Sequence, residues 1–579
     1  MANCAATLRG AICRVVLLMT LSPVGISSPA AVSPPHLEKQ GTATRLIVQG
    51  KPMLVLGGEL ANSSASSAAY LAPHWSRLKQ LHLNTVVTPV YWELIEPEEG
   101  HFDWKSVDAL LSGARANDLK LVLLWFGTWK NSMSTYVPAW VKRDPERFPR
   151  ARLPNGAGLD ILTPLAPATR DADAHAFAAL MGHLRAVDAE KSTVLMIQVE
   201  NEVGMLPVAR DYSPEASREF HEHVPAELVR ALQKECATER SADGQTHPES
   251  DLCRFWHEHG SKTDGDWAAL FGENDAAAEA FTAWYTARFV ESVTAAGKAV
   301  YPLPMYVNTA LNRPNKAPGE YPSGGPLPHL FTIWKTAAPS LDLLAPDIYF
   351  PDFIERAALY VRPDNPLFIP EANNADKPEV PGNAFFAFGK LDSIGFSPFS
   401  IDSFDTIDEH QPSALARAYS VLEQLSPAIL ASQGLGRMSG FRPRVLFDAT
   451  VIDTPVTETI GNYRFTVSFI DPWTPQKDQS TATHGGLIIQ TGPEDYLIAG
   501  QGITVTFKPT GEGSPAGISS LAARSPQAGI DSAWEGHFDA RGTWVPGRLL
   551  NGDQTHQGRH IRLAPGEFQI QRVRLYRYR

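Results

Sequence analysis

The 579-residue chain is poor in cysteine, in clustered positive charge and in long apolar runs, and each absence excludes a class of protein. Its 63 acidic and 51 basic side chains give a formal charge of −12, and no Lys/Arg cluster offers a surface for phosphates, which argues against a nucleic-acid partner. Beyond the N-terminal segment, no stretch reaches the roughly 20 apolar residues of a membrane-spanning helix. No Gly-rich phosphate loop follows the first predicted strand, which weakens a dinucleotide-binding alternative.

The N-terminal segment differs from the rest of the chain. It carries Arg9 and Arg14 without acids, a short apolar run over 11–21, and then small residues and prolines. This order is typical of a secretory signal, and the apolar run is too short to span a bilayer. We therefore predict a signal peptide over 1–30, no stable membrane insertion, and export to the periplasm; a buried N-terminal helix is the alternative.

Four cysteines are too few for a disulfide-based scaffold. Cleavage near 28–31 would remove Cys4 and Cys13 and leave only Cys236 and Cys253. In an oxidising compartment these two can form a disulfide, and two separate thiols are an equal alternative.

Metal and cofactor motifs are also missing. The triplets at His221–His223 and His257–His259 place histidines at i and i+2, which do not share a helix face as i, i+4 ligands do. Solvated helix positions explain them better, so we predict no metal site and no cofactor.

Short apolar runs alternate with helical patterns over 45–440, where eight strands are each followed by helical sequence. Parallel strands with helical crossovers form an open sheet or a barrel, and eight repeats favour the (β/α)₈ TIM barrel. A polar, His-rich helical insertion interrupts this rhythm at about 205–272. From 441 to 579 the pattern changes to alternating β segments separated by Gly, Pro and Asp, which predicts an all-β domain, a probable β-sandwich.

In a (β/α)₈ barrel, residues at the carboxyl ends of the strands form the active site. Carboxylates, amides and aromatics gather at the eight predicted ends, with hardly a cation among them: Glu59, Tyr91–Glu93, Gly127–Asn131, Glu200–Glu202, Asn308–Asn312, Asp347–Phe350, Glu371–Asn374 and Ser400–Asp402. A ring of that kind suits a neutral, hydroxyl-rich ligand such as a sugar and does not suit a phosphate.

Two carboxylates that flank a glycosidic bond can supply a proton donor and a nucleophile or base. Strand alternation places Glu200 and Glu202 on the face opposite the apolar side chains, toward the barrel axis. Glu202 lies nearer the rim and is the better proton donor, while Glu200 would support it from a deeper layer. Glu371 ends an apolar strand, where a carboxylate needs a partner or a role; a salt-bridged strand end is the alternative, and Glu93 is a weaker candidate.

Three motifs resemble the family 35 β-galactosidases of glycoside hydrolases, in the bacterial branch with a C-terminal β-domain. They are "GGEL" (Gly57–Leu60), "LNTVVTPVYWELIEPEEGHFDW" (Leu83–Trp104) and "IQVENEVG" (Ile197–Gly204), and the resemblance spans about 45–579. It implies a retaining mechanism with Glu202 as general acid/base and Glu371 as nucleophile.

The resemblance also implies sugar contacts. Asn201 would bind the 2-hydroxyl and Tyr349 would orient the nucleophile. The chain departs from the family pattern after strands one and three, where Glu59, Trp129 and Asn131 would replace familiar contacts. The predicted substrate-binding set is Glu59, Trp92, Glu93, Trp129, Asn131, Asn201, Asn308 and Tyr349.

The resemblance predicts an exo-acting retaining β-galactosidase that releases terminal β-D-galactosyl residues from oligosaccharides, such as plant cell-wall xyloglucan fragments. Alternatives are another exo-β-glycosidase of the same clan (a glucosidase, mannosidase or arabinosidase) and, in a different class, a non-catalytic sugar-binding protein. The oligomeric state stays open, with a homodimer as one option.

Overall fold

The computed structural model describes residues 33–238, 251–403, 413–510 and 527–578. The predicted signal peptide, with Cys4 and Cys13, lies outside the described residues. Within the described part of the chain, none of the helices is both long and apolar enough to cross a membrane.

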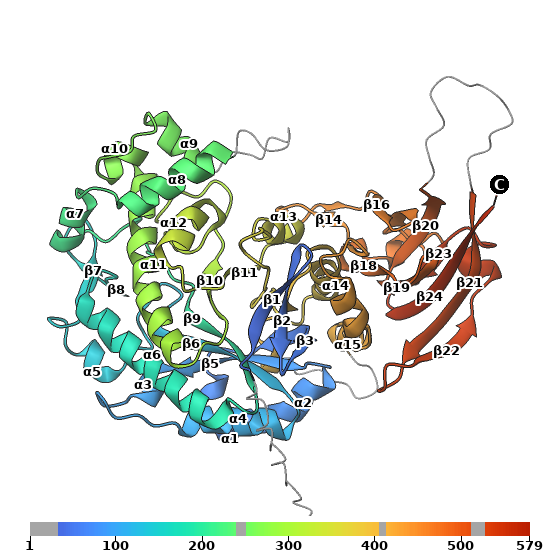
Figure 1. The fold of residues 1–579 in the computed structure, drawn as a ribbon, viewed down its shortest axis with the longest axis horizontal. Helices are drawn as coiled ribbons and strands as arrows, with labels where there is room; N and C mark the ends of the chain where they lie inside the picture. Colours follow the sequence, from blue (N-terminus) through green and yellow to red (C-terminus); the bar gives the residue numbers. More distant parts are fainter. Residues whose placement is uncertain (1–32, 239–250, 404–412, 511–526, 579) are drawn as a thin grey trace, which may run out of the picture.

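Seven parallel strands form the larger part of a barrel on the left of Figure 1. In sheet order they are β11 (Leu343–Asp347), β10 (Met305–Ala310), β9 (Val194–Asn201), β6 (Lys120–Lys130), β5 (Thr85–Tyr91), β4 (Val55–Glu59) and β12 (Gly395–Phe396). Every residue of β5, β9 and β11 is buried, as expected for strands enclosed by helices.

The predicted seventh strand closes this ring through isolated bridges. Glu371 pairs with Asp347 on one side, and Ile369 pairs with Phe396 on the other, both in parallel. Pro366 and Pro370 lack the N–H that a regular ladder needs, which explains why this stretch is not a continuous strand. The predicted (β/α)₈ barrel is thereby confirmed.

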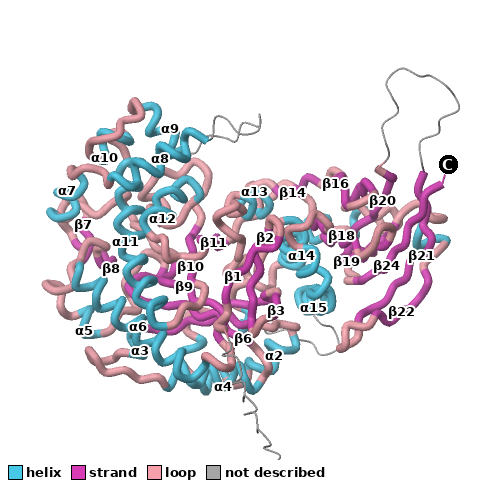
Figure 2. Tube along the Cα trace, viewed as in Figure 1, coloured by secondary structure: helices cyan, strands magenta, loops and turns pink. Residues whose placement is uncertain are grey.

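Helices cover the outside of the barrel (Figures 1 and 2). The principal ones are α4 (Lys105–Ala116), α6 (Pro167–Asp188), α11 (Asp275–Val300), α12 (Phe331–Ala337), α14 (Val380–Lys390) and α15 (Ala414–Ser432); shorter ones are α1 (Ala68–Leu71), α2 (His74–Gln80), α3 (Trp92–Ile95), α5 (Ala139–Lys142) and α13 (Phe353–Ala358). In α4 the buried residues Val107, Leu110, Leu111 and Ala114 follow the spacing of one helix face. The longest helix, α11, begins where the Asn274 side chain accepts hydrogen bonds from two backbone N–H groups.

Three short segments extend the barrel beyond its strands and helices. An antiparallel sheet of β1 (His36–Gln40), β2 (Ala43–Val48) and β3 (Lys51–Met53) precedes it, and β7 (Arg150–Arg152) pairs with β8 (Gly158–Leu162) after β6. The predicted insertion contains α7 (Pro214–Phe220), α8 (Ala226–Thr238), α9 (Asp251–Glu258) and α10 (Trp267–Phe271). A disulfide between Cys236 and Cys253 joins α8 to α9.

The C-terminal part consists of antiparallel strands, on the right of Figure 1. One sheet has six strands in the order β13 (Met438–Phe441), β18 (Gly485–Gln490), β19 (Asp495–Gln501), β24 (Gln569–Tyr578), β21 (Gln527–Phe538) and β22 (Trp544–Leu549). A second sheet has four strands in the order β16 (Val456–Ile460), β17 (Tyr463–Ser468), β20 (Ile503–Pro509) and β23 (Ile561–Leu563). A separate pair consists of β14 (Arg444–Val445) and β15 (Val451–Ile452). Side chains from both larger sheets, such as Phe465 and Tyr496, share one buried apolar cluster. The predicted all-β C-terminal part is thus confirmed.

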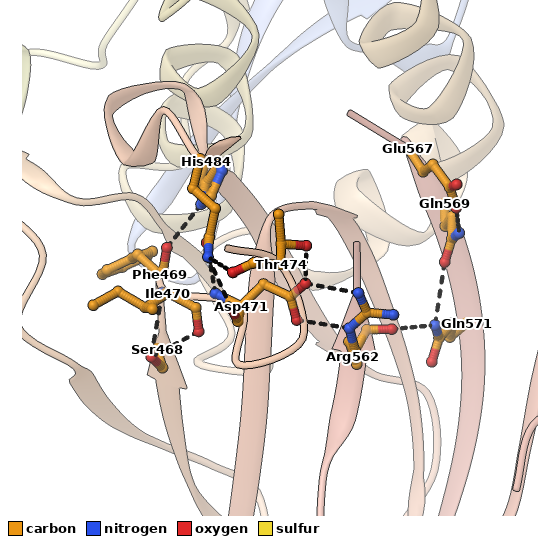
Figure 3. Close-up of polar contacts among 11 residues, drawn as sticks. Ser468, Phe469, Ile470, Asp471, Thr474, His484, Arg562, Glu567, Gln569 and Gln571 are labelled. Atoms are coloured by element: carbon orange, nitrogen blue, oxygen red, sulfur yellow. Dashed lines mark hydrogen bonds and ion pairs between the residues drawn. The ribbon is translucent and has the colours of Figure 1, made fainter. Parts of the chain in front are cut away.

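A buried ion pair fastens the loop after β17 to β23 (Figure 3). Asp471, whose side chain is fully buried, accepts hydrogen bonds of 2.6 Å from both Nε and Nη2 of Arg562. Bidentate pairing of this kind offsets the cost of burying the Asp471 carboxylate beside the partly buried Arg562. Gln571 donates to the backbone oxygen of Arg562, so the pair is held in place by the neighbouring strand.

The barrel and the C-terminal sheets are packed together through α14 and α15, which lie between them in Figure 1. The backbones of α14 and β13 approach closely at two glycines. A Cβ on Gly389 would lie 2.7 Å from Cα of Gly440, which is too short for any side chain.

Candidate active site

Four buried carboxyl groups meet at the carboxyl ends of the barrel strands. Glu59 ends β4, Glu202 follows β9, Asp347 ends β11, and Glu371 lies on the seventh strand. One oxygen from each of Glu202, Asp347 and Glu371 lies within 4.8 Å of the others. Lys130, the last residue of β6, is the buried cation whose charge acts on this cluster.

Glu202 is held by two amide side chains and one carboxyl. Its backbone N–H donates to Oδ1 of Asn308 at 2.9 Å, the Nδ2 of Asn131 donates to its Oε2, and its carboxyl hydrogen-bonds with that of Asp347. Burial, and then the charge of Glu371, raises the pKa of Glu202 to about 7, against the opposing effect of Lys130. A carboxyl with such a pKa can both give and take a proton near neutral pH.

Asp347 and Asn308 complete the surroundings of Glu202. Nδ2 of Asn308 donates to Oδ2 of Asp347 at 2.7 Å, so both polar atoms of this buried amide are used inside the protein. Burial, followed by the charges of Glu371 and Glu202, raises the pKa of Asp347 well above its usual range.

Glu371 is oriented by a phenol. The hydroxyl of Tyr349 donates to Oε2 of Glu371 at 2.7 Å, and the backbone N–H of Ile348 donates to the backbone oxygen of Glu371 at 2.8 Å. Burial and the nearby carboxylates raise the pKa of Tyr349, which keeps the phenol a donor. The other oxygen, Oε1, accepts no hydrogen bond from an amide or hydroxyl group of the described residues.

The carboxyl of Glu59 lies in hydrogen-bonding contact with that of Glu371, which requires a proton on one of the two. No donor group in the described parts of the chain reaches either oxygen of Glu59. Burial, and then the charge of Glu371, raises the pKa of Glu59 well above its usual range. The raised pKa favours the neutral form of Glu59.

Glu200 was predicted to face the barrel axis. In the structure it lies toward the helix layer and supports the site from there. Its carboxyl hydrogen-bonds with Asp173 of α6 and accepts from the backbone N–H of Trp129 at 2.7 Å. The prediction was wrong in direction because Glu200 and Glu202 adopt left-handed φ angles of 61° and 43°, which break the two-residue alternation. Burial, and then the charge of Asp173, raises the pKa of Glu200 well above its usual range.

Gly127 makes room for that arrangement. A Cβ at this position would lie 2.3 Å from Nε1 of Trp125 and 2.7 Å from Oε1 of Glu200. β6 also changes register against β9 between Trp125 and Lys130, and this irregularity brings Lys130 and Asn131 beside Asn201 and Glu202.

Four predicted sugar contacts have other partners in the structure. Trp92 is fully buried and donates from Nε1 to Glu96, so it has no free face for a sugar. Trp129 is also buried and donates from its indole to a backbone oxygen. Glu93 forms an ion pair with Lys142 at 2.9 Å. Asn308, as described above, positions Glu202 and Asp347.

Asn201 remains the strongest candidate for a sugar contact. It is fully buried, and neither atom of its side-chain amide has a partner among the described residues. An unpaired buried amide is costly unless a ligand or water completes it. Tyr349 is 36% exposed and can reach both Glu371 and a ligand.

Sequence reasoning assigned no role to Lys130, Asp173 or Asp347. Lys130 and Asp347 belong to the predicted strand-end groups. A charged residue at the end of a buried strand indicates a role in the site, and this signal could have identified both. Asp173 lies inside a helix, where nothing in its sequence surroundings indicates a role.

The acids Glu202, Asp347 and Glu371 are also close enough to take a divalent cation.

Two family models match parts of the chain. Residues 67–238 match the glycoside hydrolase family 42 model, described as "Beta-galactosidase", and residues 415–562 match a domain of unknown function, DUF5597. A β-galactosidase of Xanthomonas manihotis is 32% identical over 119 residues, which are 19% of this chain and 19% of that relative. The match therefore spans about a fifth of the relative's length.

Solved structures with similar folds include a β-amylase and β-galactosidases. The catalytic domain of the Paenibacillus polymyxa β-amylase has a TM-score of 0.42 at 14% identity, covering 66% of this chain and 98% of that one. The β-galactosidase of Marinomonas ef1 has a TM-score of 0.42 at 13% identity, covering 66% and 61%. That of Rahnella sp. R3 has a TM-score of 0.42 at 15% identity, covering 68% and 57%. By its matching family model the chain is similar to family 42 β-galactosidases over 67–238, and the assignment to family 35 is not supported.

Proposed function

We propose that the protein is a retaining β-glycosidase with β-galactosidase activity. The observation that carries this proposal is the pair of buried carboxyls, Glu202 and Glu371, whose nearest oxygens lie within 4.8 Å at the carboxyl ends of the barrel strands. Retaining enzymes place their two carboxyls about 5–5.5 Å apart, whereas inverting enzymes leave about 6.5–9.5 Å for a water molecule. The short separation supports retention.

In the first step, Oε1 of Glu371 attacks the anomeric carbon while the proton of Glu202 passes to the glycosidic oxygen, whose bond to that carbon breaks. In the second step, Glu202 takes a proton from water, the water oxygen bonds to the anomeric carbon, and the ester to Glu371 breaks. The pKa of about 7 for Glu202 supports both roles. The phenol of Tyr349 holds the non-attacking oxygen of Glu371 throughout.

We propose a terminal β-D-galactosyl residue as the substrate, with Asn201 at its 2-hydroxyl. The family 42 match and the X. manihotis relative support galactose. The unpaired, buried amide of Asn201 supports a polar contact beside Glu202. Plant cell-wall oligosaccharides such as galactosylated xyloglucan remain the proposed source of this residue.

A panel of 4-nitrophenyl β-glycosides tests the sugar. We expect the galactoside to have the highest kcat/KM; a higher value for the glucoside, mannoside or arabinoside would replace the galactosidase proposal with that activity. NMR of the first-formed product should show the β-anomer. Glu371→Gln should abolish turnover, and activity near that of the wild type would contradict the assignment of the nucleophile.

We also propose that the protein is exported and that residues 1–30 are removed. The Cys236–Cys253 disulfide supports an oxidising compartment. Expression of the full chain in a Gram-negative host should give a processed protein in the periplasmic fraction. Full-length protein in the cytoplasmic fraction would contradict export.

A further inference from the structure

Asp347 has the surroundings of a carboxyl that keeps its proton. It is 2% exposed, its Oδ2 accepts from Nδ2 of Asn308 at 2.7 Å, and its carboxyl hydrogen-bonds with that of Glu202. Two carboxyls can share a hydrogen bond only if one of them is protonated. Oδ1 of Asp347 accepts no hydrogen bond from the described residues, which is what an oxygen that carries the proton requires.

The groups around the pair decide which member is neutral. Asp347 faces the acids Glu59, Glu202 and Glu371, and its charge also acts on Tyr306 of β10 and on Tyr360. The largest charge effects on Asp347 come from these three acids, and all three disfavour its ionised form.

Glu202 is placed differently. The charge of Lys130 favours its ionised form, and Nδ2 of Asn131 donates to its Oε2. The shared proton therefore resides on Asp347, and Glu202 is the acceptor when only one proton is present.

We propose that Asp347 is the positioning residue of the acid/base step: a neutral carboxyl that donates its hydrogen bond to Glu202 and stabilises the Glu202 carboxylate whenever that residue has released its proton. This inference rests on the proposed glycosidase function. When Glu202 protonates the leaving oxygen, the bond from Asp347 stabilises the carboxylate that forms. Before the second step the same bond holds the carboxylate toward the attacking water. The proton of Asp347 itself is never transferred.

Two substitutions separate this role from a purely structural one. Asp347→Asn keeps a donor toward Glu202 and an acceptor for Asn308, so it mimics the neutral acid. Asp347→Ala removes both. Asp392→Asn is a matched control, because it makes the same Asp→Asn change away from the site. Asp392 lies in the loop before β12, at the amino ends of the strands.

For an unactivated galactoside, we expect Asp347→Ala to lower kcat/KM by about 10- to 100-fold, less than the roughly 10²–10⁴-fold that a general acid/base itself supplies, because Asp347 only positions it. For a dinitrophenyl galactoside, whose leaving group needs no proton, the loss should be less than about 3-fold. The basic limb of the pH profile should move upward in Asp347→Ala, because the lost bond favoured the Glu202 carboxylate. For the unactivated galactoside, Asp347→Asn should fall between the wild type and Asp347→Ala, because an amide is a weaker donor than a carboxyl, and its basic limb should not move downward.

Equal losses on both substrates would overturn the proposal, because a structural defect does not depend on the leaving group. A downward shift of the basic limb in Asp347→Asn would also overturn it, since that result requires a charged Asp347 in the wild type. Infrared difference spectra provide a readout that needs no substrate. At pH 7 the wild type should show a protonated-carboxyl band that Asp347→Asn lacks; no such difference would contradict a neutral Asp347 even if the protein were not a galactosidase.

Discussion

Replacing Glu202 with Gln should stabilise the folded protein at basic pH while it removes the acid/base. Burial and the neighbouring Glu371 raise the pKa of Glu202 from 4.5 to about 7, so its ionised form is disfavoured in the folded state. A rise of this size corresponds to about 3 kcal/mol, because each pKa unit is 1.36 kcal/mol. Gln has nearly the same shape, cannot ionise and still offers an oxygen to Asn131.

The sign of the pH dependence follows from the raised pKa. Below about pH 4.5, Glu202 is protonated in both states and its ionisation costs nothing. Between pH 4.5 and 7 the unfolded chain ionises first, so stability declines as the pH rises. Above pH 7 the full penalty of about 3 kcal/mol is present, and Glu202→Gln avoids it.

Urea unfolding at pH 5 and pH 8 measures this difference. We expect Glu202→Gln to gain about 2 kcal/mol or more over the wild type on going from pH 5 to pH 8. Glu93→Gln is a suitable control, because Glu93 is a partly exposed residue paired with Lys142 and its loss should change stability by less than about 1 kcal/mol. A stability difference for Glu202→Gln that does not change with pH would refute the reasoning.

Three further predictions concern the neighbours of the catalytic pair. Tyr349→Phe removes one hydrogen bond to the Glu371 carboxylate and should lower kcat by about 10- to 100-fold with KM little changed, measured by steady-state kinetics; an unchanged kcat would contradict the positioning role. Gly127→Ala should lower the free energy of unfolding by about 1–3 kcal/mol, because its Cβ would overlap Trp125 and Glu200; a variant as stable as the wild type would show that these groups can move aside. EDTA followed by dialysis should leave turnover unchanged, because the raised pKa values of Glu202 and Asp347 and the charge of Lys130 make the carboxyl cluster a poor cation site; recovery of lost activity on adding Mg²⁺ or Ca²⁺ would show the opposite.

The strand pattern was sufficient to predict which residues approach the barrel rim. Glu202, Asp347 and Glu371 each follow a buried apolar strand, and parallel strands bring their carboxyl ends to one edge. That rule depends only on element order, and element order is readable from hydrophobic periodicity.

The same pattern was not sufficient to say where those side chains point. Trp92 was predicted to contact sugar but packs in the core, because its indole lies against Trp125 and Trp140 and donates to Glu96. Glu200 lies toward α6 because Glu200 and Glu202 adopt left-handed φ angles, whereas strand alternation assumes regular β geometry.

The sequence by itself determined the barrel, the all-β C-terminal part and the residues available at the strand ends, because these follow from periodicity and from local chemistry. Only the tertiary structure decided how those residues pair. The bonds of Asp347 to Glu202 and of Glu59 to Glu371 join residues 145 and 312 positions apart, and the shift of the Glu202 pKa depends on burial that no local pattern encodes. These distant carboxyls meet because closing the barrel brings its first, fourth, sixth and seventh strands to one edge.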